Sequence, residues 1–165
     1  MSDDKTYHVL FICTQNSARS IMAEGFLNHL GGTRFRAHSA GSHPAGTVHP
    51  LALRTLQHYL VPTEGFRSKD WAEFAQPGAP EMDFVFTVCD KAAGEVCPVW
   101  PGQPMTAHWG VADPSAVGGS EAEQFRAFND AATVLKRRIE LMMALPLASL
   151  DRLAIQREVR DIGMR

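Results

Sequence analysis

The stretch YHVLFICTQNSARS, residues 7–20, decides how the rest of the chain is interpreted. Its first part, Tyr7–Ile12, is a short run of β-branched and aromatic residues, which is typical of a buried strand. The run stops at Cys13, and Thr14–Ser17 has the composition of a turn. A helix is expected over residues 19–30, where apolar side chains recur on one face and two glycines follow. The stretch therefore predicts a strand, a tight loop and a helix in direct succession.

Further strands and helices alternate along the chain. Strands are predicted over residues 36–40 and 82–88, and the second of these ends at Cys89. Residues 90–114 are rich in proline and glycine and are expected to be mostly loop. Helices are predicted over residues 50–60 with Leu60 on the apolar face, over residues 121–143, and over residues 146–162 with Leu147, Leu150 and Leu153 as the apolar stripe. This alternation predicts an α/β domain around a parallel sheet, and ligands of such sheets bind beyond the carboxyl ends of the strands.

Length and composition restrict the function classes. A chain of 165 residues is expected to form a single domain, residues 1–165, with residues 146–165 as a C-terminal helical extension. The net charge of -2 offers no basic field for nucleic acid or an anionic membrane. No apolar run approaches the ~20 residues that cross a bilayer, and the polar start of the chain is not expected to be a signal peptide. Three cysteines do not suggest a disulfide framework, so a cytoplasmic enzyme or small-ligand binder is expected.

The loop of residues 13–20 has the chemistry of an oxyanion-binding cup. A short loop that feeds a helix N-terminus points successive backbone N–H groups inward, toward a tetrahedral anion. The residues expected to bind the anion are Thr14, Gln15, Asn16, Ser17, Ala18, Arg19 and Ser20. Arg19 adds a planar fork that can bind two oxygens, and the same surroundings are expected to lower the pKa of the Cys13 thiol and make it a nucleophile. The alternative is a buried structural cysteine at a strand end.

This cup and a second motif resemble a known family. The Cys-x5-Arg-Ser loop, the following IMAE (residues 21–24) and HWGVADP (residues 108–114) are similar to the low-molecular-weight protein tyrosine phosphatase superfamily, over about residues 6–143. Within it the chain is most similar to the arsenate reductases that share the phosphatase fold. The resemblance implies a four-stranded parallel sheet flanked by helices, with Cys13 attacking a tetrahedral oxyanion. It also implies an external thiol reductant and no tightly bound cofactor.

Cys89 and Cys97 are open to three interpretations. Zinc ligation with His108 is disfavoured by the long spacing, and inert packing cysteines are a second alternative. A redox role is favoured because an oxidised thiolate needs a resolving thiol. In the resembling thioredoxin-coupled arsenate reductases three cysteines relay a disulfide, which implies transfer from Cys13 through Cys89 to Cys97. Seven residues separate the last two cysteines, one more than in those relatives, and Ala18 stands where some relatives carry another cysteine. A glutaredoxin and glutathione route stays open.

Asp113 and a set of polar residues complete the resemblance. The matching aspartate protonates the leaving group in the phosphatases and assists loss of hydroxide from arsenic in the arsenate reductases, whereas an isolated Asp-Pro would be a turn starter. Ser115 follows where the phosphatases usually have an aromatic residue, which argues against a tyrosine-phosphate substrate. Four residues match positions that support the loop in relatives, in some of them around a potassium ion: Asn16, Glu24, Ser39 and Asp70. Asn16 is expected to adopt a left-handed backbone conformation, and no other metal is expected.

The favoured function is reduction of arsenate to arsenite by Cys13 and a cysteine disulfide relay, in arsenical resistance, with thioredoxin preferred to glutaredoxin and glutathione as the donor. The alternative is a low-molecular-weight phosphatase that hydrolyses phosphomonoesters through a phosphocysteine. A third hypothesis, a non-catalytic oxyanion-binding module, would require neither Asp113 nor a resolving cysteine. Phosphate and sulfate are expected to compete with arsenate, because the cup recognises tetrahedral geometry and charge rather than arsenic.

Overall fold

The computed structural model describes residues 5–90, 94 and 100–165. The described residues form a sheet of four strands, β1 (Tyr7–Cys13), β2 (Phe35–Gly41), β3 (Phe84–Thr87) and β4 (Met105–His108). The strands lie in the order β2-β1-β3-β4, and every neighbouring pair is parallel. The predicted four-stranded parallel sheet is therefore confirmed.

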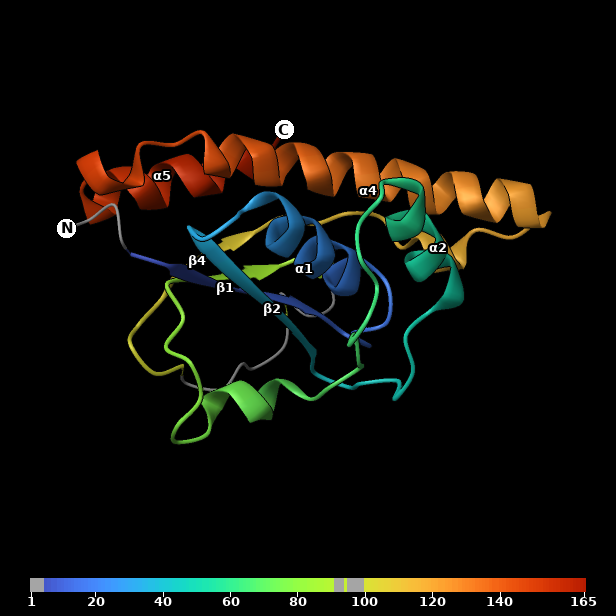
Figure 1. The fold of residues 1–165 in the computed structure, drawn as a ribbon, viewed down its shortest axis with the longest axis horizontal. Coiled ribbons are helices and arrows are strands. Elements are labelled where there is room, and N and C mark those ends of the chain that lie inside the picture. Colours follow the sequence, from blue (N-terminus) through green and yellow to red (C-terminus); the bar gives the residue numbers. More distant parts are fainter. Residues whose placement is uncertain (1–4, 91–93, 95–99) are drawn as a thin grey trace.

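Four α-helices are described around this sheet: α1 (Arg19–Leu30), α2 (Pro50–His58), α4 (Glu121–Met143) and α5 (Arg152–Ile162). Short 3₁₀ helices occur at η2 (Trp71–Ala75), η3 (Pro114–Ala116) and η4 (Leu147–Ser149). Helices α1, α2 and α4 pack against one another, η2 contacts β2, and α5 contacts β4 and α4. Figure 1 shows α4 and α5 passing along one side of the molecule, with η2 on the opposite side. No helix within the described ranges has both the length and the apolar character to span a bilayer.

Two of the predicted helices were wrong in their extent. The helix over residues 146–162 is instead η4 followed by α5, because the Asp151 side chain accepts a hydrogen bond from Ala154 N (2.8 Å) and caps a new helix there. As a result Leu153 is 79% exposed, and α5 buries Ile155, Val159 and Ile162 in place of the predicted leucine stripe. Helix α2 ends at His58, and Leu60 follows it with a φ of 61° and 83% exposure.

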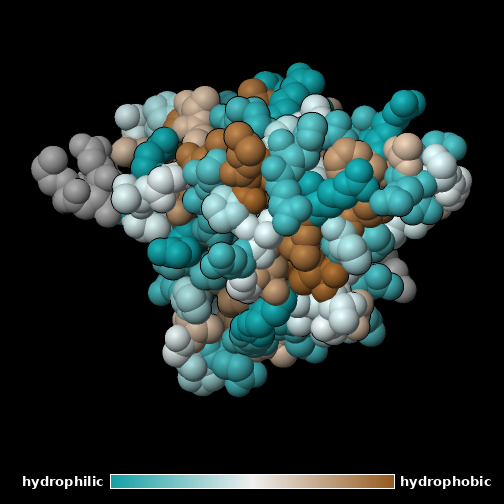
Figure 2. Space-filling model, turned by 45° about the vertical axis from the view of Figure 1, so that its right-hand side comes forward, coloured by the Kyte–Doolittle hydropathy of each residue, from teal (hydrophilic) through white to brown (hydrophobic). Residues whose placement is uncertain are grey.

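The core lies where β1 is covered by α1. Val9, Leu10, Phe11 and Ile12 are all fully buried, and so are Ile21 and Met22 on the facing helix. The surface, by contrast, carries its hydrophobic residues in small separate groups among hydrophilic ones on the face drawn in Figure 2. Burial of the central strand on both faces explains why its sequence is a continuous apolar run.

The sheet register brings two cysteines to one edge. Cys13 is the last residue of β1, and Ile12 pairs with Thr87 of β3, two residues before Cys89. Because the strands are parallel, their carboxyl ends meet at the same edge, and the cysteine-bearing loops begin there side by side.

Candidate active site

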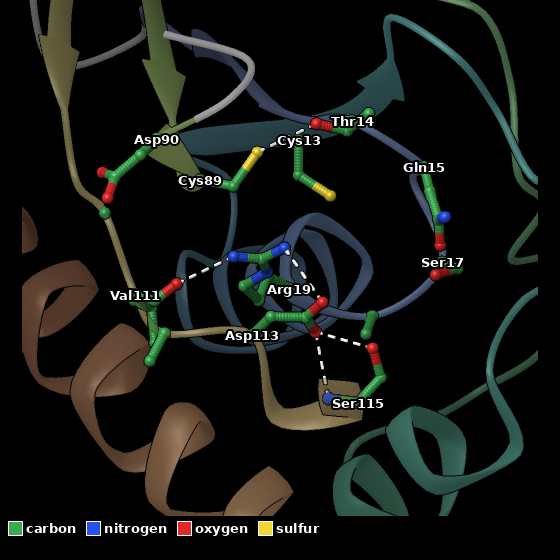
Figure 3. Close-up of a pocket in the computed structure, with 13 residues that line it drawn as sticks. Cys13, Thr14, Gln15, Ser17, Arg19, Cys89, Asp90, Val111, Asp113 and Ser115 are labelled. Atoms are coloured by element: carbon green, nitrogen blue, oxygen red, sulfur yellow. Dashed lines mark hydrogen bonds and ion pairs between the residues drawn. The ribbon is translucent and has the colours of Figure 1, made fainter. Parts of the chain in front are cut away.

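One pocket of about 540 Å³ collects most of the expected site residues. Its walls come from the loop after β1, the start of α1, the residues after β3 and residues 110–115. Figure 3 shows Cys13, Cys89, Arg19 and Asp113 around this pocket. Cys97 lies outside the described residues, so its place relative to this pocket stays a prediction.

The backbone of the cup loop is fixed by hydrogen bonds between its carbonyl groups and residues 43–49. The carbonyl oxygens of Thr14, Gln15 and Ser17 accept hydrogen bonds from the backbone N–H groups of His43 (2.8 Å), Ala45 (3.0 Å) and His49 (2.9 Å), respectively. In a trans peptide the C=O and N–H groups point in opposite directions. Carbonyls turned outward to residues 43–49 therefore turn the following N–H groups toward the pocket, as an oxyanion site requires.

Asn16 fixes the sharpest bend of the loop. Its backbone has a φ of 49°, which is the left-handed conformation expected from the sequence. The buried Asn16 side chain donates to Ser20 Oγ (2.8 Å) and accepts from Lys69 N (2.9 Å). The bend passes so close to the end of β2 that a Cβ at Gly41 would lie 2.5 Å from the Thr14 carbonyl oxygen. Only glycine fits there, so residue 41 helps to define the cup.

The pKa of Cys13 differs from the sequence-based expectation. The hydrogen bond with the Cys89 thiol and burial raise the pKa of the Cys13 thiol, whereas the Ser20 hydroxyl and the Arg19 guanidinium lower it. The prediction of a lowered pKa was wrong because it considered the cup alone and not a second thiol beside it. Both cysteines are 3% exposed. Two adjacent buried sulfur atoms do not readily carry two negative charges, so the thiols act as a pair.

Arg19 and Asp113 lie next to each other in the wall of the pocket. Arg19 donates through Nη1 to the Val111 carbonyl oxygen (2.9 Å), and its Nη2 lies 3.7 Å from Asp113 Oδ2. The other Asp113 oxygen accepts from both the N–H (2.9 Å) and the hydroxyl (2.7 Å) of Ser115. Ser115 thus orients the carboxylate at the start of η3, and Oδ2 is the oxygen directed to the pocket side where Arg19 lies.

The surroundings of Cys89 include residues that sequence reasoning did not place. The Thr14 hydroxyl oxygen lies 3.4 Å from Cys89 Sγ, which links the cup directly to the second thiol. The next residue, Asp90, pairs with His108 Nε2 (2.7 Å), and His108 Nδ1 lies 2.8 Å from Thr87 Oγ1. His108, considered above as a zinc ligand together with Cys89 and Cys97, thus contacts Asp90 and Thr87 within the described part of the chain, and Cys97 lies outside it.

A lysine side chain lies where the sequence led us to expect a potassium ion. The Lys69 ammonium occupies it, with Nζ 3.0 Å from the Arg67 carbonyl oxygen, 3.2 Å from Ser39 Oγ, 3.4 Å from Asn16 Oδ1 and 3.6 Å from Glu24 Oε1. Ser39 also donates to Glu24. Because the ammonium group already neutralises the Glu24 carboxylate and contacts the other oxygens, these residues do not fit an additional potassium ion.

The two charges of this cluster are partly desolvated, and Asp70 takes no part in it. Burial lowers the pKa of Lys69, against the raising effect of Glu24, and burial raises the pKa of Glu24, against the lowering effect of Lys69. The Asp70 carboxylate instead accepts from Ala72 N (2.8 Å) and caps η2. Lys69 was missed because it is 53 residues from Asn16 in the sequence, and no local pattern connects them.

Comparison with known proteins gives a consistent result. The model of the low molecular weight phosphotyrosine protein phosphatase family matches residues 8–156. An arsenate reductase of Halalkalibacterium halodurans is 31% identical over 132 residues, which are 80% of this chain and 91% of that protein. A solved arsenate reductase in the phosphate binding state has a TM-score of 0.66 at 26% identity, covering 84% of this chain and 98% of the other. A thioredoxin-dependent arsenate reductase of Corynebacterium glutamicum has a TM-score of 0.55 at 27% identity, covering 83% and 63%, respectively.

Proposed function

The chain belongs to the low molecular weight phosphotyrosine protein phosphatase family, and we propose that within this family it is an arsenate reductase. The observation that carries the proposal is the second buried thiol, Cys89, in the same pocket as Cys13 and in contact with Thr14 of the cup. A phosphatase needs one cysteine, whereas reduction of an oxyanion needs a second thiol to take up the oxidation. The similarity to proteins named arsenate reductase supports the same proposal.

The first step is attack of Cys13 on arsenic. Arsenate binds to the inward N–H groups of the cup and to Arg19, which can exchange its contact with the Val111 carbonyl for the anion. Because the pKa of Cys13 is raised, the thiol holds its proton until an acceptor arrives, and the bound oxyanion can be that acceptor. A sulfur–arsenic bond then forms and an arsenic–oxygen bond breaks. The Asp113 carboxylate relays the thiol proton to the departing hydroxyl oxygen, which leaves as water.

The second step is attack of Cys89 on the sulfur of Cys13. Once Cys13 is bonded to arsenic, its sulfur is the electrophile that the Cys89 thiolate attacks. The Thr14 hydroxyl lies where it can donate to that thiolate. A disulfide forms between Cys13 and Cys89, and the electron pair of the sulfur–arsenic bond goes to arsenic. Arsenic is reduced from the +5 to the +3 state and leaves as arsenite.

The third step extends the proposal to Cys97. Attack of Cys97 on Cys89 would release Cys13 and move the disulfide out of the cup, where a protein reductant can reach it. The relative described as thioredoxin-dependent supports thioredoxin as that reductant. We further propose that the chain works as a single domain over residues 1–165, in the cytoplasm, with arsenical resistance as its role.

The test is arsenate-dependent oxidation of NADPH with thioredoxin and thioredoxin reductase, run in parallel with glutaredoxin, glutathione and glutathione reductase. Turnover with thioredoxin that is lost in Cys89→Ser is the expected result. Hydrolysis of p-nitrophenyl phosphate faster than arsenate turnover, and unaffected by Cys89→Ser, would replace the proposal with a phosphatase. Binding of arsenate without either reaction would leave only an oxyanion-binding module.

A further inference from the structure

A buried guanidinium from α4 holds the loop that carries Asp113. We call residues 108–114 the acid loop. The Arg138 side chain, from a residue that is 7% exposed, donates through Nη1 to the Gly110 carbonyl oxygen (3.0 Å) and through Nε to a carbonyl oxygen of Arg165 (3.1 Å). Burial lowers the pKa of Arg138. Burying a charged group opposes folding unless hydrogen bonds compensate. The two hydrogen bonds of Arg138 do so, and they connect the acid loop, at Gly110, to Arg165.

Helix α5 contacts the same loop from a second direction. The buried Trp109 donates from its indole N–H to the Val159 carbonyl oxygen (2.9 Å), and its ring stacks on Phe86. A Cβ at Gly163 would lie 2.3 Å from the His108 carbonyl oxygen and 2.9 Å from the Trp109 ring. This close fit involves Val159 and Gly163, which lie beyond residue 156, where the match to the family model ends.

The acid loop in turn positions two groups of the pocket. Val111, the residue after Gly110, donates its N–H to the Val88 carbonyl oxygen (3.0 Å) and accepts from Arg19 Nη1 (2.9 Å). Asp113, two residues further, places Oδ2 3.7 Å from Arg19 Nη2. A shift of the Gly110 carbonyl would therefore move both the partner of Arg19 and the carboxylate of Asp113.

We propose that Arg138 is a positioning residue for Asp113, acting through the Gly110 carbonyl, and that α5 supports the same loop through Trp109. This inference rests on the proposed arsenate reduction, because it assigns Arg138 to the proton delivery of the first step. Arg138 does not reach the pocket floor itself and is not a catalytic residue. The C-terminal helical extension thereby becomes part of the support of the active site.

The kinetic test compares Arg138→Met with Arg137→Met, which changes an exposed arginine one position away on α4. Arg138→Met is expected to lower kcat about tenfold with KM for arsenate within about twofold, because misplacing a proton donor affects the transition state more than binding. Arg137→Met should match the wild type. In Asp113→Asn the further change Arg138→Met should cost nothing more, since the group that Arg138 positions is already lost. Independent losses that multiply in the double variant would overturn the proposal.

A second measurement needs no arsenate. Hydrogen exchange of the Trp109 and Val111 amides, which bond to β3 and to Val88, should accelerate in Arg138→Met and not in Arg137→Met. If these amides exchange as in the wild type, Arg138 does not fix the loop and the proposal is wrong. If the wild type exchanges as expected but does not reduce arsenate, the proposed function fails while the positioning role stands. Should Arg138→Met not fold, Arg138→Gln takes its place in both measurements, because its shorter side chain lacks the guanidinium that reaches Gly110 but keeps a polar group at this depth.

Discussion

Two loops leave the same edge of the sheet and are held in different ways. The loop after β1 is fixed by backbone hydrogen bonds to residues 43–49 and by the buried side chain of Asn16. After β3, Val88 still forms backbone hydrogen bonds with Ile12 (2.8 Å) and Val111 (3.0 Å). The next two residues make side-chain contacts instead, Cys89 with Thr14 (3.4 Å) and Asp90 with His108 (2.7 Å). The Asp90 side chain is 96% exposed, so that pair lies in water.

The difference corresponds to two chemical demands. Binding an oxyanion requires donors that are already in place, because reorganising them during the reaction would cost free energy. Disulfide exchange requires that two sulfur atoms approach to about 2.05 Å and then separate, so a thiol in such a relay has to move. We therefore expect changes in the cup to affect every step, and changes around Asp90 to affect only the transfer through Cys89.

The largest effect is expected for the two cysteines. Cys13→Ser should reduce turnover by at least about 10³-fold, because Cys13 is the one thiol within the cup loop of residues 13–20. Cys89→Ser should also stop turnover but leave the first step intact. Protection of Cys13 from iodoacetamide by phosphate should therefore survive in Cys89→Ser. Loss of that protection would mean that Cys89 also supports the cup, which would weaken the distinction between the two loops.

A backbone change in the cup comes next. Gly41→Ala places a Cβ against the Thr14 carbonyl oxygen and should lower kcat/KM about 10²-fold by displacing the loop. Gly118→Ala is the matched control, since a Cβ at Gly118 meets no atom within 4 Å. Steady-state kinetics and the affinity for phosphate measure both variants. Equal activity of the two variants would show that the cup is less rigid than its hydrogen bonds indicate.

Removal of the Lys69 ammonium tests how much the buried cluster of Lys69 and Glu24 stabilises the protein. Lys69→Met leaves the Glu24 carboxylate buried without its partner and should lower the free energy of unfolding by about 3 kcal/mol, by analogy with broken buried ion pairs. Glu24→Gln in the same chain should restore most of the loss. Lys136→Met, which breaks an exposed pair with Glu140, should cost less than about 0.5 kcal/mol. Urea denaturation provides the values, and a loss for Lys69→Met no greater than for Lys136→Met would contradict the account.

The smallest effect is expected at Asp90. Asp90→Asn weakens an exposed pair with His108, and such pairs contribute about 0–1 kcal/mol, so the rate of the Cys89 step should change by no more than about fivefold. The affinity for phosphate should not change. A loss of phosphate affinity in Asp90→Asn would show that the two loops are one unit.

Local sequence was sufficient to predict the structural features whose causes lie in neighbouring residues. The strand that ends at Cys13, the helix that begins at Arg19 and the left-handed Asn16 were all predictable because their causes lie within a few positions. The start of α5 was not predictable, since Pro146 and Asp151 are both residues that can begin a helix and they lie only a few positions apart.

Features that depend on contacts between distant segments could not be derived in this way. The raised pKa of Cys13 depends on Cys89, 76 residues later, and the ammonium of Lys69 comes from a segment that has no pattern of its own. Arg138 lies on a predicted helix, but nothing in the helical period indicates that it reaches the Gly110 carbonyl. Sequence identified the chemistry of the site, and tertiary packing determines its electrostatics.

The central claim is that Cys13 and Cys89 work in succession on one oxyanion, and single turnover without reductant tests it most directly. Reduced protein mixed with one equivalent of arsenate should release about one equivalent of arsenite. Peptide mapping should then find Cys89 in a disulfide, with Cys97 in the intact chain and with Cys13 in Cys97→Ser. Recovery of arsenite only when glutathione is added, with glutathione on Cys13 and Cys89 still a thiol, would contradict the claim.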